Sequence, residues 1–185
     1  MLVIFTQVAF YSAVAIFTLF INYGYASALC ENNHKNIFVS NTTPTSDFID
    51  NGNGTVTHLI TGLIWQRCSV GQYWDGKSCV GKATDFTWYE ALQQARDNKY
   101  LNYDDWYLPN KNELASIIEF SCFQPAVNAA LFPNTPSWSY WSSSPNDYND
   151  FMTGGAWYIS FYNVYINSID KGNSFYVRLV RASEE

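Results

Sequence analysis

Two short segments of alternating hydrophobic and polar residues flank a turn sequence at residues 48–57 of this 185-residue chain. Phe48-Ile49-Asp50 and Thr55-Val56-Thr57 stand on either side of Asn51-Gly52-Asn53-Gly54. Asn and Gly adopt positive φ angles readily, so this order predicts a β-hairpin. The apolar segment Leu63-Ile64-Trp65-Gln66 then predicts a buried strand.

The spacing of apolar residues becomes helical in the middle of the chain. Thr87 and Glu90 have the three-residue spacing of a capping box, which marks the start of a helix. The apolar residues that follow share one helical face: Trp88, Ala91, Leu92 and Ala95. This segment predicts an amphipathic helix with that face against the core.

A second helix start follows about twenty residues later, at Asn110 and Glu113. Pro109 favours an extended approach by Leu108, and we expect Trp106 and Leu108 to lie in the core just before the helix. The apolar stripe of this helix is expected to consist of Leu114, Ile117 and Ile118.

Strict alternation returns after Trp138, at residues 156–161 and 163–167, and residues 170–173 have the composition of a turn. Trp157, Ile159 and Phe161 are expected to face the core. Tyrosines occupy the opposite positions and are expected to form one aromatic face near the polar loop 146–150: Tyr158, Tyr165 and Tyr176. A hairpin, two helices and a C-terminal antiparallel sheet together predict an α+β fold.

The first 28 residues contain no charged side chain. Residues 8–21 are apolar apart from Ser12 and Thr18, and Ala26-Ser27-Ala28 has the pattern of a cleavage site. These features predict a signal peptide at 1–28, with an uncleaved N-terminal anchor as the alternative because no basic residue precedes the apolar run. We expect an extended lead-in at 29–47 and one domain at 48–183, extracytoplasmic and off the membrane once the signal is removed.

All four cysteines follow that segment, and export makes disulfides their expected state. Cys68 and Cys79 flank a short turn-rich segment and are expected to pair locally, which leaves Cys30 to pair with Cys122. A four-cysteine zinc site is disfavoured because the chain contains no Cys-x-x-Cys pair.

The formal net charge of −6 disfavours nucleic acid and anionic membranes as partners. Aromatic residues make up 18% of the chain, and their rings can stack on sugars while their polar tips bond hydroxyls. The candidate ligand-binding residues lie opposite the expected core face or on a loop: Tyr148, Tyr158, Tyr165 and Tyr176. Arg178 and Arg181 are expected to hold the last strand through hydrogen bonds to carboxylates.

Several segments, taken in order, resemble one family of exported bacterial domains. They are residues 50–56, 61–66, the loop between Cys68 and Cys79, and residues 87–92, 106–114, 125–128, 132–135, 141–143 and 177–181. Residues 106–114 contain Leu108-Pro109-Asn110. The family is that of the C-terminal domain of the Legionella collagen-like adhesin. The resemblance implies a fold like that of C-type lectins and formylglycine-generating enzymes, and an adhesin-like role, which in the collagen-like adhesin is binding of sulfated host glycans. Tyr107 departs from the family, which usually has Arg there, and the acidic charge favours a neutral sugar, a protein or a cationic surface over a polyanion.

Catalysis is not expected. The two histidines, His34 and His58, stand in no recognisable motif, and no cysteine follows Cys122 to serve a formylglycine-generating reaction. Calcium has candidate ligands in Asn146, Asp147 and Asp150. The second half of the calcium-binding motif of C-type lectins is missing, so no cofactor is expected and calcium is the alternative.

The sequence therefore predicts an exported module that binds a glycan or a surface protein through its C-terminal aromatic residues and loops. The alternative is a structural or assembly domain that meets a partner subunit, and its oligomeric state is left open. A degenerate enzyme of the formylglycine-generating type is the remote third hypothesis.

Overall fold

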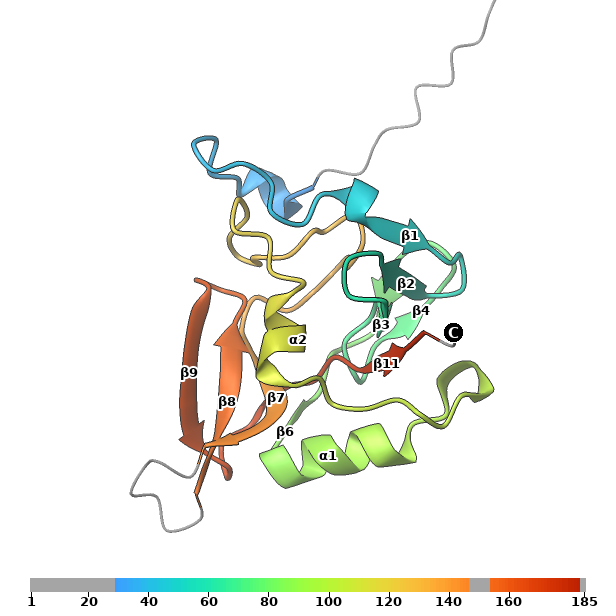
Figure 1. Cartoon of the computed structure of the whole chain (residues 1–185), viewed down its shortest axis with the longest axis vertical. Helices are drawn as coiled ribbons and strands as arrows, with labels where there is room; N and C mark the ends of the chain where they lie inside the picture. The colour runs from blue at the N-terminus through green and yellow to red at the C-terminus, as the bar shows by residue number, and fades with distance from the viewer. Residues whose placement is uncertain (1–28, 147–153, 184–185) are drawn as a thin grey trace, which may run out of the picture.

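Two main β-sheets and two helices pack around two hydrophobic clusters in the computed structural model, which describes residues 29–146 and 154–183 (Figure 1). The predicted signal peptide lies outside the described residues, as do three candidate site residues: Asp147, Tyr148 and Asp150. The fold is α+β, as the sequence predicts.

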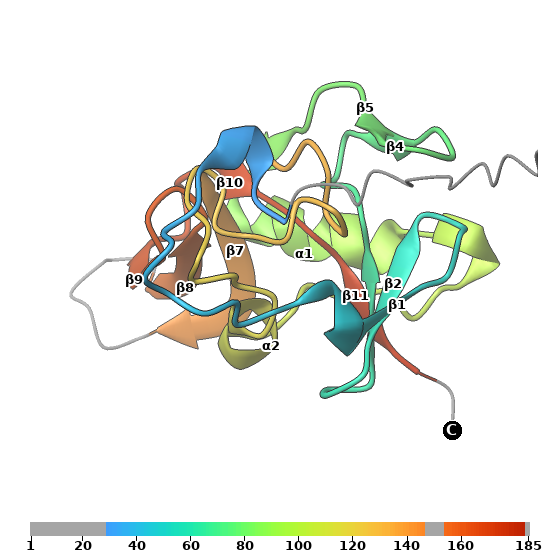
Figure 2. The same ribbon diagram turned by 90° about the horizontal axis from the view of Figure 1, so that it is seen from above.

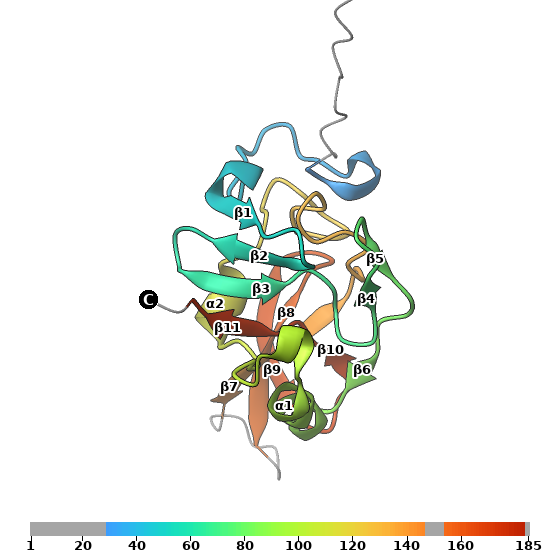
Figure 3. The ribbon, with the colours of Figure 1, turned by 90° about the vertical axis from the view of Figure 1, so that its right-hand side faces the viewer.

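The first sheet has four strands in the order β1-β2-β3-β11, all antiparallel. They are β1 (Phe48–Asp50), β2 (Thr55–His58), β3 (Leu63–Gln66) and β11 (Val180–Ala182). The predicted hairpin is confirmed, with Asp50 opposite Val56. Its turn requires Gly54, where φ is +88° and an added Cβ would collide with Tyr100 and Trp74. Figure 3 shows this sheet face on, with α1 beside it.

The second sheet has five strands in the order β6-β10-β7-β8-β9. They are β6 (Asp85–Phe86), β7 (Ser139–Asn146), β8 (Gly155–Ser160), β9 (Tyr165–Asp170) and β10 (Phe175–Tyr176). Every pair is antiparallel except β10 with β7, which is parallel, so the C-terminal sheet is mixed rather than purely antiparallel. The reason is that the chain leaves β9 at one edge and re-enters the sheet on the far side of β7, where it runs in the direction of β7.

Short elements complete the structure. The disulfide-bonded loop contains a two-stranded ribbon of β4 (Tyr73–Trp74) and β5 (Cys79–Val80), visible at the upper right of Figure 2. Single 3₁₀ turns occur at η1 (Glu31–Asn33), η2 (Thr45–Asp47) and η3 (Tyr100–Asn102).

Both predicted helix starts are confirmed. Helix α1 (Trp88–Asp97) begins with a capping box in which the Thr87 N–H donates to Glu90 Oε2 at 2.8 Å. Helix α2 (Lys111–Ala115) begins at Asn110, whose Oδ1 accepts from two backbone N–H groups at 2.9 Å each. Helix α2 ends at Ala115, before two of the three residues of the predicted apolar stripe. Ile117 and Ile118 are buried as expected, but they lie in the turns that follow the helix.

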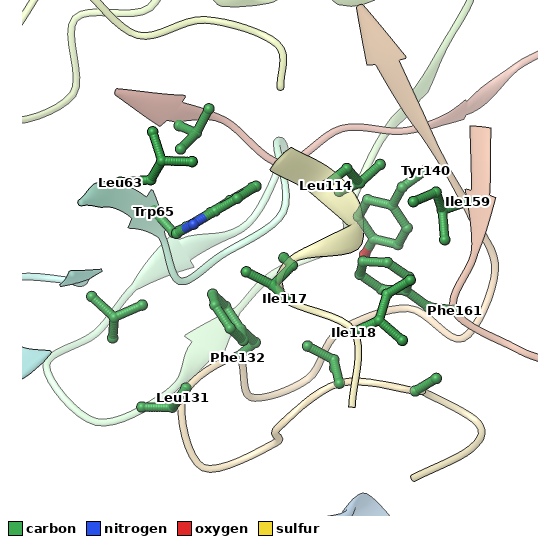
Figure 4. Packing of buried hydrophobic residues seen from close by; sticks show 14 of the residues in the cluster. Leu63, Trp65, Leu114, Ile117, Ile118, Leu131, Phe132, Tyr140, Ile159 and Phe161 are labelled. Atoms are coloured by element: carbon green, nitrogen blue, oxygen red, sulfur yellow. The ribbon is translucent and has the colours of Figure 1, made fainter. Parts of the chain in front are cut away.

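The interior consists of two clusters that lie on opposite faces of the second sheet. The first joins the four-stranded sheet to α2 and the inner side of β7 and β8, and its largest members include Trp65, Leu114, Phe132, Tyr140 and Phe161 (Figure 4). The second lies under α1: Trp88, Ala91, Ala95, Trp106, Leu108, Trp141, Ala156, Val177 and Leu179. Trp106 and Leu108 are buried just ahead of α2, which confirms their predicted place in the core.

Both predicted disulfides are present, Cys30–Cys122 and Cys68–Cys79, and all four cysteines are paired. The first ties the lead-in to the middle of the chain, and Figure 2 shows that segment passing over one end of the molecule before it enters β1.

A buried carboxylate holds the lead-in at a second point. Glu119 is fully buried, and its oxygens accept from the backbone N–H groups of Thr42, Thr43 and Ser121 at 2.8–3.0 Å. Burial alone would raise the pKa of Glu119, but these hydrogen bonds outweigh it and the pKa is lowered. The lead-in is therefore bonded to the domain along its length, although the sequence suggests only an extended, polar segment.

The two C-terminal arginines differ from each other. Arg181 Nε donates to the carboxylate of Asp105 at 2.8 Å, as predicted. The prediction is wrong for Arg178, whose fully buried guanidinium donates to the backbone carbonyls of Gln66 and Arg67 and to the hydroxyl of Thr135. Carbonyl and hydroxyl oxygens take the place of the expected carboxylate, and the guanidinium carbon lies 4.6 Å from the centroid of the Phe132 ring.

Candidate binding groove on the outer face of the C-terminal sheet

Alternation along β8 directs successive side chains to opposite faces of the sheet. Ile159 and Phe161 are fully buried on the inner face, as predicted, and the Phe161 ring stacks on Tyr140 with centroids 4.5 Å apart. Trp157 shares their parity but is only half-buried, with the Lys111 ammonium 4.3 Å from its ring centroid. The inner face of β8 therefore belongs to the core near its C-terminal end.

Tyr158 points to the opposite face, as its position predicts, but it is not free there. Its ring packs against Phe175 with centroids 4.7 Å apart and meets Trp141 edge-on at 6.4 Å. Burial, followed by the nearby hydroxyl of Tyr165, raises the pKa of Tyr158. The phenol therefore stays protonated at neutral pH and retains its hydrogen-bond donor.

Tyr165 lies on the same face as Tyr158 and is exposed. In the ladder between β8 and β9, Ser160 lies opposite Tyr165 and Tyr158 lies opposite Asn167. Residues that lie opposite each other share a face, and Tyr158 and Ser160 share one because they are two positions apart on β8. The Asn167 amide donates to the Tyr165 hydroxyl at 2.9 Å, which limits where the hydroxyl can lie. Two of the predicted tyrosines are thus brought together.

Tyr176 does not join them, and the expected single face of three tyrosines is not formed. Strand β10 pairs with β7 rather than with β8 or β9, and Tyr176 lies opposite Tyr140. Its ring is half-buried on the inner side, with its centroid 5.7 Å from that of Tyr140. The prediction assumed that the three strands that carry these tyrosines are neighbours. After β9 the chain instead crosses to the other side of β7, so β10 lies next to β7 and not next to β8 or β9.

A groove of about 250 Å³ lies on the outer face, at the turn that joins β8 to β9. Its lining comes from the start of β7, the end of β8 and that turn: Trp138, Ser139, Tyr158, Ser160, Tyr162, Asn163 and Tyr165. Three of its four rings are well exposed, at 58% for Trp138, 47% for Tyr162 and 53% for Tyr165. None of the lining residues carries a charge.

Alternation alone misses Trp138 and Tyr162, because both lie just outside the strands. Trp138 directly precedes β7, and Tyr162 lies in the turn after β8. The sequence does contain a signal for them, since an aromatic ring next to a strand end is placed at the rim of a sheet. Val164, which has φ of +62°, then turns the chain back into β9.

Another hollow, of about 220 Å³, lies between the β1–β2 hairpin and residues 101–106. Its polar groups bond to one another: the Asn51 amide donates to the hydroxyls of Thr55 and Thr57 at 2.9 and 3.1 Å, and Arg181 bonds Asp105. A ligand there would have to compete with these existing bonds. We therefore regard the aromatic groove as the candidate site.

The predicted calcium loop is only partly described. Asn146 lies at the end of β7, and its amide donates to the Ser168 hydroxyl at 2.7 Å. Over residues 29–146 and 154–183, no group of three or more His, Cys, Asp or Glu side chains could hold a metal ion. In the same ranges, no helix is long and apolar enough to cross a membrane.

A disulfide-bonded α+β domain, with an aromatic groove beside the part of the sheet that α1 covers, is the class that this fold defines. The model of the Lcl C-terminal domain matches residues 54–181, and the chain belongs to that family. No curated protein sequence matches the chain. Two disulfides fit the oxidising compartments in which exported domains reside. The relation to C-type-lectin-like folds stays a prediction.

Proposed function

We propose that this domain is an exported recognition module that binds an uncharged, hydroxyl-rich glycan in the groove on the outer face of β8 and β9. The observation that carries the proposal is the combination of four aromatic rings with an uncharged lining. Flat rings stack on the C–H faces of sugars, and the hydroxyls of the tyrosines and serines bond sugar hydroxyls.

The charge distribution supports a neutral ligand over a sulfated one. Sulfate recognition relies on Arg or Lys side chains, which form charge-assisted hydrogen bonds with anionic oxygens. The groove lining contains neither residue, and the chain as a whole carries −6. An acidic chain repels polyanions at long range, so a sulfated glycan would have to bind elsewhere on this domain.

Binding rather than catalysis is proposed for the same lining. General acid–base chemistry near neutral pH most often uses His, Asp, Glu or Lys, and none of these lines the groove. The raised pKa of Tyr158 makes its phenol a poor general base at neutral pH. The rings and hydroxyls of the groove can hold and orient a ligand, which is the role we propose for it.

The direct test is a glycan array followed by titration of the best neutral oligosaccharide, using secreted protein with both disulfides formed. Trp138→Ala and Tyr165→Ala should each weaken binding by about tenfold, the loss expected for one stacked ring. Tyr73→Ala is the matched control, because Tyr73 is 64% exposed on β4, outside the groove. The affinity should also be nearly independent of salt.

Two outcomes of these measurements would contradict the proposal. Binding confined to sulfated glycans, weakened by salt and unchanged in Trp138→Ala and Tyr165→Ala, would overturn the proposal. Retention of affinity for a neutral sugar in both variants would place the binding site elsewhere on the domain.

A further inference from the structure

The lead-in contains a turn that displays two large apolar side chains to solvent. The Val39 N–H donates to the Asn36 carbonyl at 3.2 Å, which closes a β-turn with Ile37 and Phe38 at its centre. The Asn36 Oδ1 also accepts from the Phe38 N–H at 3.0 Å and holds the turn. Ile37 is 80% exposed and Phe38 is 92% exposed. Central turn positions usually hold Gly, Pro, Asn, Asp or Ser, so this pair departs from the usual turn chemistry.

Two more exposed rings lie on the segment to which this part of the lead-in is bonded. The Asn36 N–H donates to the Ser121 carbonyl at 2.7 Å, and the Phe123 N–H donates to the His34 carbonyl at 3.1 Å. Phe120 is 51% exposed and Phe123 is 41% exposed, with the Phe123 ring stacked on His34. Single exposed apolar residues are common, whereas four on two bonded segments indicate a contact surface. We call these four side chains the apolar end: Ile37, Phe38, Phe120 and Phe123.

The apolar end lacks the acidic charge that the rest of the chain carries. Residues 32–46 contain one charged residue, Lys35, and residues 120–146 contain none, although the chain as a whole carries −6. Glu119 is fully buried and bonded to backbone N–H groups, and Glu31 is half-buried. Contact with an apolar surface here would therefore not desolvate an exposed carboxylate of these two segments. A basic partner, in contrast, would find no exposed acidic residue on them.

The same end of the domain is joined to the uncharged N-terminal segment. The Ala129 N–H donates to the Leu29 carbonyl at 2.7 Å, and Cys30 is disulfide-bonded to Cys122. The lead-in forms the end of the molecule at the top of Figure 1. Residues 2–21 are predominantly apolar and match the length of a membrane span, and both a signal peptide and an anchor enter the membrane during export. Residues 22–28 can extend over at most about 25 Å, so export brings this end close to the membrane.

We propose that the apolar end binds the surface of an uncharged lipid bilayer, with Ile37 and Phe38 inserted among the headgroups. Exposed apolar side chains, the lack of exposed acidic charge and the junction with a membrane-entering segment favour a bilayer over a second copy or another protein. Lys35, which is exposed one residue before the turn, can reach lipid phosphates from there. This proposal changes the expectation, drawn from the sequence, that the domain leaves the membrane once the signal is removed.

The contact is weak by itself. A single myristoyl chain binds a bilayer with an association constant of about 10⁴ M⁻¹, and the side chains of Ile37 and Phe38 together hold fewer apolar carbons. We therefore expect a constant below that value and binding at millimolar lipid. A contact of this strength orients a domain that is already near the membrane.

Flotation with vesicles of pure phosphatidylcholine tests the contact. The secreted, oxidised chain from residue 29 onward contains every described element and should float with the vesicles at millimolar lipid. Ile37→Ser combined with Phe38→Ser should lower the partition coefficient by at least about tenfold, because both side chains lose most of their apolar surface. The matched control is Leu59→Ser combined with Ile60→Ser, at positions 54% and 74% exposed between β2 and β3, which should leave the coefficient unchanged.

Two results of the flotation would overturn the proposal. The first is no flotation of the native chain at millimolar lipid. The second is an equal loss in both double variants, which would mean that any exposed apolar pair suffices. Flotation that needs anionic lipid and disappears at high salt would also overturn it, because binding would then depend on charge rather than on the apolar side chains.

Sedimentation velocity without lipid separates a bilayer from a protein as the occupant of the apolar end. Ile37→Ser combined with Phe38→Ser should leave the sedimentation coefficient unchanged at every concentration. Association of the native chain that this double variant abolishes would assign the apolar end to a second copy and overturn the proposal. Neither residue lines the groove, so the double variant should keep its affinity for a glycan, and the two proposals fail separately.

Discussion

Phe161 and Tyr162 are neighbours in the chain, yet they belong to two regions of the molecule with opposite properties. Phe161 is fully buried on the inner face of the C-terminal sheet, where it stacks on Tyr140. Tyr162 is 47% exposed on the outer face, where it lines the groove. Both faces are rich in aromatic rings, and the difference between them is what covers each face. Helix α2 and the first sheet cover the inner face. Helix α1 covers part of the outer face, and the groove lies beyond it, where no described segment lies over the rings of Trp138, Tyr162 and Tyr165.

This comparison separates aromatic content from aromatic function. An aromatic fraction of 18% is high enough to supply both a core and a binding surface, so the fraction itself assigns neither role. A ring under another element contributes to the free energy of unfolding, and a ring on an open face contributes to affinity. The predictions below test that division.

The largest expected effect is the loss of the ring from the closed face. Phe161→Ala should lower the free energy of unfolding by about 3–5 kcal/mol, because it leaves a cavity beside Tyr140. The adjacent substitution, Tyr162→Ala, should change it by less than about 0.5 kcal/mol. Urea unfolding of the two variants, followed by circular dichroism, measures both. Equal losses would mean that the outer face is a second core and would break the comparison.

The second prediction uses the buried carboxylate on the closed side. Glu119→Gln should lower the free energy of unfolding by about 2 kcal/mol at neutral pH, because an amide NH₂ would then face backbone N–H donors. The pKa of Glu119 is lowered in the folded protein, so its contribution is complete above its unfolded pKa and is lost as pH falls through the folded pKa.

The pH profile of that difference is the measurement. The gap between the native chain and Glu119→Gln should be constant above about pH 5 and should shrink below about pH 4.5. Taking the difference cancels other groups that titrate in the same range, including the buried His58, whose pKa is lowered by burial. A gap that stays constant down to pH 3 would show that the charge of Glu119 is not what holds the lead-in.

Tyr158 lies on the boundary between the two regions and should show both properties. Its ring packs on Phe175 and Trp141 and also lines the groove. Tyr158→Ala should lower the free energy of unfolding by about 1–2 kcal/mol and also weaken ligand binding. Tyr158→Phe keeps the packing and removes only the hydroxyl, so it should restore stability. A Tyr158→Ala variant of unchanged stability would place this ring wholly on the open face.

The smallest expected effect is the response of the groove to pH. Because its lining holds no Asp, Glu, His, Lys or Arg, affinity for a neutral glycan should be nearly constant between about pH 5 and 9. Isothermal titration at several pH values measures this directly. Below about pH 6.5 stability should decline, because burial lowers the pKa of His58 in the folded chain and the unfolded chain then binds more protons. Affinity should not change over the same range, which would sharpen the contrast between the two regions. A titration midpoint within that range would require a charged group that the groove lining lacks.

Local features of the structure could be predicted because the sequence encodes them within a few residues. The hairpin turn depends on Asn and Gly between residues 51 and 54, and the helix starts depend on Thr87 with Glu90 and on Asn110 with Glu113. Each is a short-range hydrogen-bond or φ-angle preference that needs no distant partner. The short disulfide follows the same logic, since Cys68 and Cys79 are close along the chain.

The candidate site was only partly predictable from the sequence. Alternation along a strand shows which of its residues share a face, but it does not show which strands lie next to each other in the sheet. Alternation along β8 and β9 placed Tyr158 and Tyr165 on one face, which the pairing of these strands confirms. It could not show that β10 inserts between β6 and β7, which carries Tyr176 to the inner side. It also overlooked Trp138 and Tyr162, whose positions depend on how the strand ends are folded back.

The sequence by itself therefore determined the turns, the caps, the cysteine pairing and which residues within one strand share a face. Only the tertiary structure decided which strands are neighbours and which parts of each face are covered. The physical reason is range: φ preferences and side-chain capping act over a few residues, whereas strand order depends on crossovers that bring distant segments together. Burial of Phe161 and exposure of Tyr162 is a choice of that second kind, because the two residues differ mainly in what packs over them.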